Sequence, residues 1–133
     1  MILFFCTGEF DYKVKSLVPL IFPCDLISRR IPVLCGGRQL IVVTPTQRQV
    51  QQSQEKWRKY VNDVVTVAAS PYGGWKEIEQ VCRKISELQG PLVVMDCIGY
   101  SFAMKREVAE KTGKTVVLSR TMAARVISEL SDI

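Results

Sequence analysis

Short apolar runs rich in β-branched residues alternate along this chain with segments of helical periodicity. Each run is apolar almost throughout, which is typical of a strand that is covered on both faces of a sheet. Strands that alternate with helices form crossover units and therefore lie parallel. We expect an α/β fold of three layers (α/β/α), with a mainly parallel sheet of four to five strands. The expected strands are 2–6, 39–43, 64–68, 92–95 and 115–118.

Apolar residues recur at helical spacing in the segments between these runs. A helix over 25–34 would be N-capped by Asp25 and ended or kinked early by Pro32. Gly113 is expected to cap the C-terminus of the helix that precedes it. The other expected helices are the Gln-rich surface segment 46–60, the segment 78–88 and the terminal segment 122–130.

The length of 133 residues suits a single domain over residues 1–133, and 47% hydrophobic with 23% charged residues is ordinary globular composition. No apolar run approaches the roughly 18 residues that a membrane span requires. The apolar opening 1–5 is short, lacks a basic region and soon meets Glu9 and Asp11, which argues against a secretory signal. We therefore expect a cytoplasmic protein with no membrane partner.

The formal net charge of +5 raises the question of nucleic acid. The lysines and arginines, however, are spread along the chain and mixed with acidic residues. Aromatic residues do not interleave with them as they do in sites that stack bases. A solvated surface is the favoured interpretation, and we expect no nucleic-acid partner.

The sequence has five cysteines and no histidine. Without histidine the chain has no Ser-His-Asp or Cys-His catalysis and no imidazole metal ligand. The cysteines form no CxxC pair, so with no export signal we expect reduced thiols and no metal site. Proton transfer near neutral pH would use Cys, Asp, Glu, Lys or Tyr with a shifted pKa. The glycine patterns of nucleotide sites are also missing, so a nucleotide site is poorly supported.

Residues that follow the expected strands are candidates for a site, because ligands of parallel sheets bind beyond the carboxyl ends of the strands. Cys97 follows such a strand and precedes a helix that begins near Ser101. Amide N–H groups at a helix N-terminus stabilise thiolate, and Gly99 would let the backbone approach a ligand closely. For Cys97 alone, a small apolar residue at a strand end is nevertheless the favoured interpretation.

Cys6 has the same placement, with Thr7 and Gly8 after it, and this brings the catalytic and the structural interpretation of the two cysteines to equal weight. Cys82 differs, because it lies on the apolar stripe of its helix and is expected in the core. Residues 44–46 (Thr-Pro-Thr) favour a plain strand exit in which Thr46 caps the next helix. The competing interpretation is that these hydroxyls and helix N–H groups bind a carboxylate.

Two cysteine-bearing blocks and one strand of this sequence resemble those of AroM family proteins. The block 94–100 and the later stretches 116–120 and 124–126 are similar to the C-terminal part of that family. The opening block 3–10 resembles an internal block of the family, and 42–45 resembles its middle strand. Because this family is related to the aspartate/glutamate racemase superfamily, the resemblance implies one half of an Asp/Glu racemase-like fold.

Proteins of that superfamily place one cysteine on each side of a substrate, between two similar α/β halves. The resemblance therefore implies catalytic roles for Cys6 and Cys97. It implies racemase- or isomerase-type proton transfer without a cofactor, in which one thiolate removes a proton next to a small carboxylate and the opposite thiol returns one. The substrate-binding residues that it implies are Thr7, Gly8, Thr44, Pro45, Thr46, Ile98, Gly99 and Tyr100.

AroM proteins carry about a further domain's worth of residues before the block that contains Cys6. The resemblance thus implies that residues 1–133 are the C-terminal portion of such a protein, with an N-terminal domain absent. Two alternatives to the enzyme stay open. One is a module that binds a small carboxylate without turning it over. The other is an inactive fragment that forms a homodimer through apolar surface around 2–6 and the terminal helix.

Overall fold

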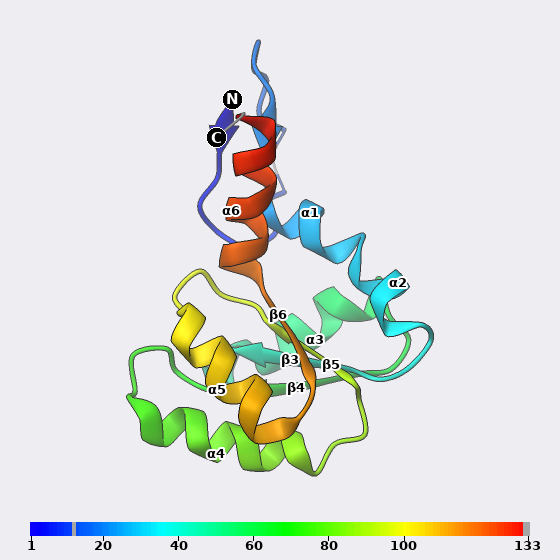
Figure 1. The fold of residues 1–133 in the computed structure, drawn as a ribbon. Helices are drawn as coiled ribbons and strands as arrows, with labels where there is room; N and C mark the ends of the chain where they lie inside the picture. The colour runs from blue at the N-terminus through cyan, green and yellow to red at the C-terminus, as the bar shows by residue number, and fades with distance from the viewer. Residues whose placement is uncertain (12, 132–133) are drawn as a thin grey trace.

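The computed structural model describes residues 1–11 and 13–131. Its main sheet has four parallel strands in the order β4-β3-β5-β6 (Figure 1). Three of them, β4, β5 and β6, coincide with predicted runs, and β3 is shifted by one residue. The strands are β3 (Leu40–Thr44), β4 (Val64–Ala68), β5 (Leu92–Met95) and β6 (Thr115–Leu118). The predicted parallel α/β sheet is confirmed.

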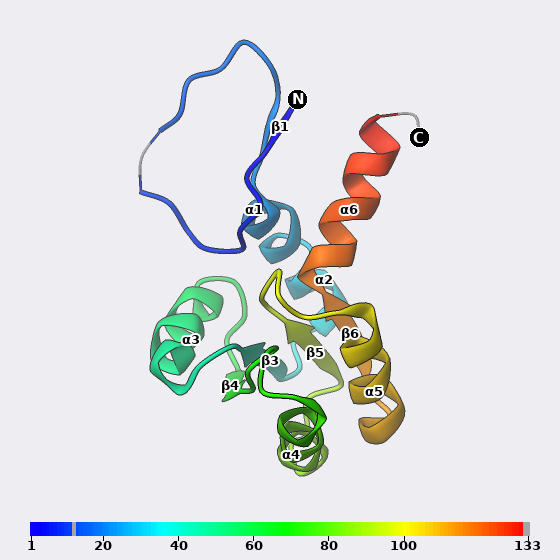
Figure 2. The ribbon, with the colours of Figure 1, turned by 90° about the vertical axis from the view of Figure 1, so that its left-hand side faces the viewer.

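Helices cover both faces of this sheet, as predicted (Figures 1 and 2). Successive side chains of a strand point to opposite faces, so Ile41 and Val43 pack on one helical layer and Leu40 and Val42 on the other. The first layer contains α4 (Trp75–Ser86) and α5 (Phe102–Thr112). The second contains α1 (Pro23–Ser28), α2 (Ile31–Cys35) and α3 (Val50–Arg58), which follows the 3-10 turn η1 (Gln47–Gln49).

The two ends of α5 follow the sequence signals. Ser101 caps α5, because its side chain accepts a hydrogen bond from the Met104 N–H at 3.2 Å. Gly113 ends α5 in the left-handed conformation with φ 67°, which glycine adopts without strain. Cys82 is buried in the core, also as predicted. No helix in the described part of the chain is long and apolar enough to cross a membrane.

The segment 25–34 is two helices rather than one. Phe22 is the N-cap of α1, so the expectation that Asp25 caps this helix is wrong. Pro32 lies in the first turn of α2, where a backbone N–H has no partner within the helix and proline is well tolerated. Pro32 therefore starts the second helix instead of ending the first.

The prediction of a buried strand at 2–6 is wrong. Only Ile2–Leu3 forms a strand (β1), and it pairs parallel with β2 (Leu20–Ile21) as a separate sheet. Phe5 lies beyond β1 and is 66% exposed, although Ile21 of β2 is buried. Figure 2 shows the described part of the segment before α1 extending away from the main sheet, at the same end of the molecule as α6 (Ser119–Leu130).

Candidate functional site

The carboxyl ends of β3 and β5 meet at the point where the chain reverses its direction across the sheet. β3 is followed by α3 on one face, whereas β5 is followed by α5 on the other. The two connections diverge and leave a crevice between the strand ends, which is the usual ligand position in open parallel sheets. The backbone N–H of Asp96 donates to the Val43 carbonyl at 2.9 Å and extends the pairing of the two strands to the edge of this crevice.

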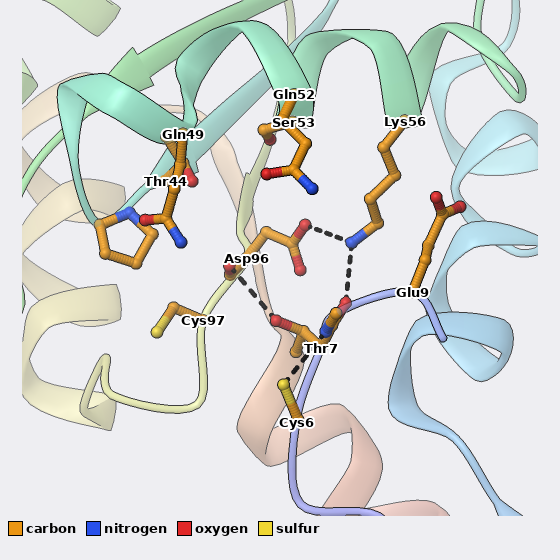
Figure 3. A pocket seen from close by; sticks show the side chains of 12 residues that line it. Cys6, Thr7, Glu9, Thr44, Gln49, Gln52, Ser53, Lys56, Asp96 and Cys97 are labelled. Carbon is orange, nitrogen blue, oxygen red and sulfur yellow. Dashed lines mark hydrogen bonds and ion pairs between the residues drawn. The ribbon is translucent and has the colours of Figure 1, made fainter. Parts of the chain in front are cut away.

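A cavity of about 270 Å³ lies at this crevice. Its lining comes from the ends of β3 and β5, from one side of α3 and from the loop after β1. Figure 3 shows the side chains of α3 on one side of the cavity and the two cysteines on the other. The residues that line it are Cys6, Thr7, Gly8, Glu9, Thr44, Pro45, Gln49, Gln52, Ser53, Lys56, Asp96 and Cys97.

Asp96 is a buried carboxylate at the centre of a polar network. Its Oδ2 accepts hydrogen bonds from Lys56 Nζ and from Trp57 Nε1, each at 2.8 Å. Its Oδ1 accepts a longer bond of 3.4 Å from the Ser119 hydroxyl. A buried charge is tolerated only when it is paired and hydrogen-bonded, and this carboxylate meets both conditions.

Lys56 joins this carboxylate to the N-terminal segment. Its Nζ also donates to the Thr7 carbonyl at 2.9 Å (Figure 3). Burial lowers the pKa of the Lys56 ammonium, but the charge and hydrogen bond of Asp96 raise it, and the net pKa lies above the ordinary value. Lys56 therefore stays charged at physiological pH.

Both cysteines of the cavity sit in turns of the same local geometry. In residues 6–8 the Gly8 N–H donates to Cys6 Sγ at 3.3 Å, and in residues 97–99 the Gly99 N–H donates to Cys97 Sγ at 3.3 Å. Each sulfur thus accepts a backbone N–H from the glycine two residues after it. Such a donor stabilises a thiolate relative to a thiol.

The charge state of Cys97 differs from the expectation of a lowered pKa. Burial raises the pKa of this thiol, the Gly99 N–H lowers it by less, and the negative charge of Asp96 raises it further. Cys97 precedes the capped N-terminus of α5, but desolvation outweighs the stabilisation of thiolate there. Its resting form at neutral pH is the thiol.

The structure brings six of the predicted site residues to the cavity wall, namely Cys6, Thr7, Gly8, Thr44, Pro45 and Cys97. The other four lie outside the lining that the described residues form. Tyr100 is fully buried, and its hydroxyl donates to the Ala69 carbonyl at 2.6 Å. Thr46 is exposed and is the N-cap residue of η1, as predicted, but its hydroxyl donates to the Gln49 side chain and makes no cap hydrogen bond to the backbone. Ile98 and Gly99 form the turn behind Cys97.

Sequence reasoning missed Lys56, Trp57 and Ser119 as parts of the site. Lys56 lies in a Gln-rich helix whose charged residues look solvated. The available signal was Asp96, an acid placed directly after four apolar strand residues. A carboxylate at such a position requires a buried partner, although the sequence does not say which cation supplies it.

Among the comparisons with known proteins, one shows a family and another shows a fold. The family model described as AroM protein matches residues 1–131. No curated protein matches the sequence. The crystal structure of an allantoin racemase from Pseudomonas fluorescens is similar, with a TM-score of 0.57 and 17% identity over 86% of this chain and 53% of that chain. At this identity the likeness shows the fold, and this chain spans about half the length of that racemase.

Proposed function

Since this chain belongs to the AroM family, and its fold resembles that of an allantoin racemase, we propose that its cavity carries out cofactor-independent proton transfer at a carbon next to a carboxylate. The reaction would be a racemisation or an isomerisation of a small molecule. The observation that carries this proposal is the pair of cysteine turns, each with its sulfur held by a glycine N–H, at one cavity.

The proposed step conserves atoms and electrons without an external oxidant or reductant. The thiolate of one cysteine takes a proton from the substrate carbon, so that a C–H bond breaks and an S–H bond forms. The electron pair stays on the substrate as an enolate-like carbanion. The thiol of the other cysteine then delivers its proton to the opposite face of that carbon.

The environments of the two cysteines suit them to different starting roles. Because burial keeps the Cys97 thiol protonated, Cys97 is the proton donor in the first half of the cycle. Cys6 is exposed and takes the proton from the substrate. The roles reverse for the reverse reaction, as microscopic reversibility requires.

Hydroxyl groups of the cavity would hold the substrate carboxylate. Ser53 Oγ is buried and has no hydrogen-bond partner among the described residues, and it lines the cavity together with Thr44. A buried hydroxyl without a partner costs free energy unless a ligand or water satisfies it. A carboxylate oxygen next to Ser53 would supply that partner.

Exchange of the substrate α-proton tests the proposal directly. The chain is incubated in D₂O with aspartate and glutamate, each of which has a C–H next to a carboxylate, and deuterium at that carbon is measured by NMR. We expect exchange with at least one of these compounds, and a loss of about 10²-fold or more in both Cys6→Ala and Cys97→Ala. Cys82→Ala, which removes a thiol outside the cavity, serves as the control. Unchanged exchange in both cavity variants would contradict the mechanism.

A binding module without turnover is the second candidate. The raised pKa of Cys97 favours it, because a thiol held in its neutral form is a poor base. In that case a carboxylate would bind at the cavity, and Ser53→Ala would weaken this binding. No deuterium would enter the carbon next to the carboxylate. Calorimetric titration alongside the exchange experiment separates the two candidates.

The homodimer also stays a prediction. Apolar side chains at the β1–β2 end of the molecule are exposed, including Ile2, Leu17 and Leu130. Exposed apolar surface of this kind favours association. Sedimentation at high micromolar concentration tests this, and a strictly monomeric species would contradict it.

A further inference from the structure

We propose that Lys56 is a positioning residue that sets the separation of the two cysteine turns, a role that rests on the function proposed for the pair. Its Nζ donates at once to the Thr7 carbonyl at 2.9 Å and to Asp96 Oδ2 at 2.8 Å. Thr7 directly follows Cys6, and Asp96 directly precedes Cys97. One ammonium group therefore bridges the backbone of one turn and the residue that opens the other (Figure 3).

The Lys56 bridge is the stronger of two links that the described residues form between Thr7 and Asp96. The direct one is a hydrogen bond from the Thr7 hydroxyl to the Asp96 carbonyl at 3.5 Å, which is at the long limit for such a bond. The bonds of Lys56 are short and assisted by charge, and bonds of that kind are about twice as strong as neutral ones. The relative position of the two turns thus depends chiefly on this side chain.

Lys56 is itself held rigidly enough to act as a spacer. Its side chain is 11% exposed, and the neighbouring Trp57 donates to the same carboxylate oxygen. Two successive residues of α3 are therefore fixed to Asp96. Because the Asp96 charge also keeps the pKa of Lys56 raised, the bridge persists through the neutral and mildly alkaline range in which thiols act.

Loss of Lys56 should affect the two turns unequally. Asp96 keeps Trp57 and Ser119 as donors, and its backbone remains paired with β3. Among the described contacts, Thr7 keeps the long bond from its hydroxyl, and its segment keeps the exposed ion pair between Glu9 and Lys59. The Cys97 turn should therefore stay in place, whereas the Cys6 turn moves away from it.

A short bifunctional thiol reagent measures this separation without any substrate. We expect the reagent to link Cys6 to Cys97 in the unmodified chain, as identified by mass spectrometry of the peptides. In Lys56→Met the yield of this link should fall roughly tenfold, because the effective concentration of one thiol near the other falls. Lys59→Met is the matched control, since Lys59 reaches the same segment through an exposed ion pair with Glu9 at 3.0 Å.

A second variant keeps the test decisive if Lys56→Met does not fold. Lys56→Met combined with Asp96→Asn removes both members of the buried pair, and the Asn amide oxygen still accepts from Trp57. The link should stay lost in this variant although the fold is restored. A full yield of the link in either folded variant would overturn the proposal. Because no turnover is measured, this outcome is distinct from a failure of the α-proton exchange.

Discussion

The two cysteine turns share a local geometry but differ in what supports them. The Cys97 turn follows the buried strand β5, whose pairing with β3 continues into Asp96, and it leads into a helix capped by Ser101. The Cys6 turn follows a strand of only two residues, and both Cys6 and Gly8 are exposed. Yet the N–H to sulfur distance is 3.3 Å in both.

This contrast shows that the conformation of a cysteine turn and its position in the molecule have different causes. A Cys-X-Gly turn needs only three consecutive residues to direct an N–H at a sulfur, so the turn forms in either setting. Its position in the molecule is a different matter. The sheet fixes Cys97, whereas Cys6 is placed by contacts of its neighbours, above all the bonds of Thr7 to Lys56 and Asp96.

The largest effect is expected from Asp96→Ala, which removes the residue common to both supports. Lys56 and the Trp57 indole would lose their acceptor, and the ammonium would be left buried without a counter-charge. Breaking such a pair from one side costs about 3–5 kcal/mol. Urea unfolding followed by far-UV circular dichroism measures the change in the free energy of unfolding.

Asp63→Ala is the matched control for this prediction. Asp63 is exposed and accepts one long side-chain bond from Gln39 at 3.4 Å, so its removal should leave the unfolding midpoint nearly unchanged. If Asp96→Ala lowered the free energy of unfolding as little as this control, the Lys56 ammonium would have to be hydrated after losing its partner. The site would then be less closed than the burial of both side chains indicates.

A glycine-to-alanine pair sharpens the comparison, because each turn has one glycine at the same position. A Cβ at Gly99 would stand 2.9 Å from the Tyr72 hydroxyl oxygen and 3.0 Å from Pro71 Cγ. Among the described residues, a Cβ at Gly8 would meet Cys6 Sγ alone, at 3.4 Å, which is ordinary contact. Tyr72 is exposed and can move, but Pro71 is buried.

We therefore expect Gly99→Ala to destabilise the chain by about 1–3 kcal/mol, as other overpacked positions do. Gly8→Ala should cost clearly less, because the surroundings of the Cys6 turn are open. Thermal unfolding of the two variants under one condition gives the difference. Equal costs would mean that the Cys6 turn is packed as tightly as its counterpart.

The sheet and one of the cysteine turns could be predicted from the sequence, because their signals lie within short runs of consecutive residues. The runs that became β4, β5 and β6 are apolar and β-branched because both faces are covered, and the end of β5 carries Cys97. The run 2–6 is also apolar, but an apolar run does not by itself say whether other parts of the chain will bury it. Its burial was therefore predicted wrongly.

Lys56 could not be predicted for a different reason. Its partners are 40 and 49 residues away in the chain, at Asp96 and Thr7. No spacing in this part of the sequence distinguishes it from Lys59, the exposed C-cap residue of α3. A buried ion pair becomes visible only when the fold brings its two members together.

The smallest expected effect is a difference in alkylation rate between the two cavity thiols. This rate reports how the surroundings of the Cys6 and Cys97 sulfurs differ. The thiolate is the form that reacts with iodoacetamide. Because burial raises the pKa of Cys97, a smaller fraction of Cys97 is thiolate at neutral pH than of a thiol with the ordinary pKa. Its sulfur is also less accessible than that of exposed Cys6. We expect exposed Cys6 to be modified several-fold faster near neutral pH.

The difference in rate should narrow once the pH exceeds the raised pKa of Cys97, because its sulfur is then mostly thiolate. Peptide mapping by mass spectrometry over a time course gives both rates from one sample, and the chain unfolded in urea supplies the reference in which the two rates converge. Faster modification of Cys97 would mean that the Gly99 N–H and the start of α5 outweigh desolvation. In that event Cys97 would be the base in the first half of the proposed cycle and Cys6 the acid, and the better supported turn would hold the more reactive thiol.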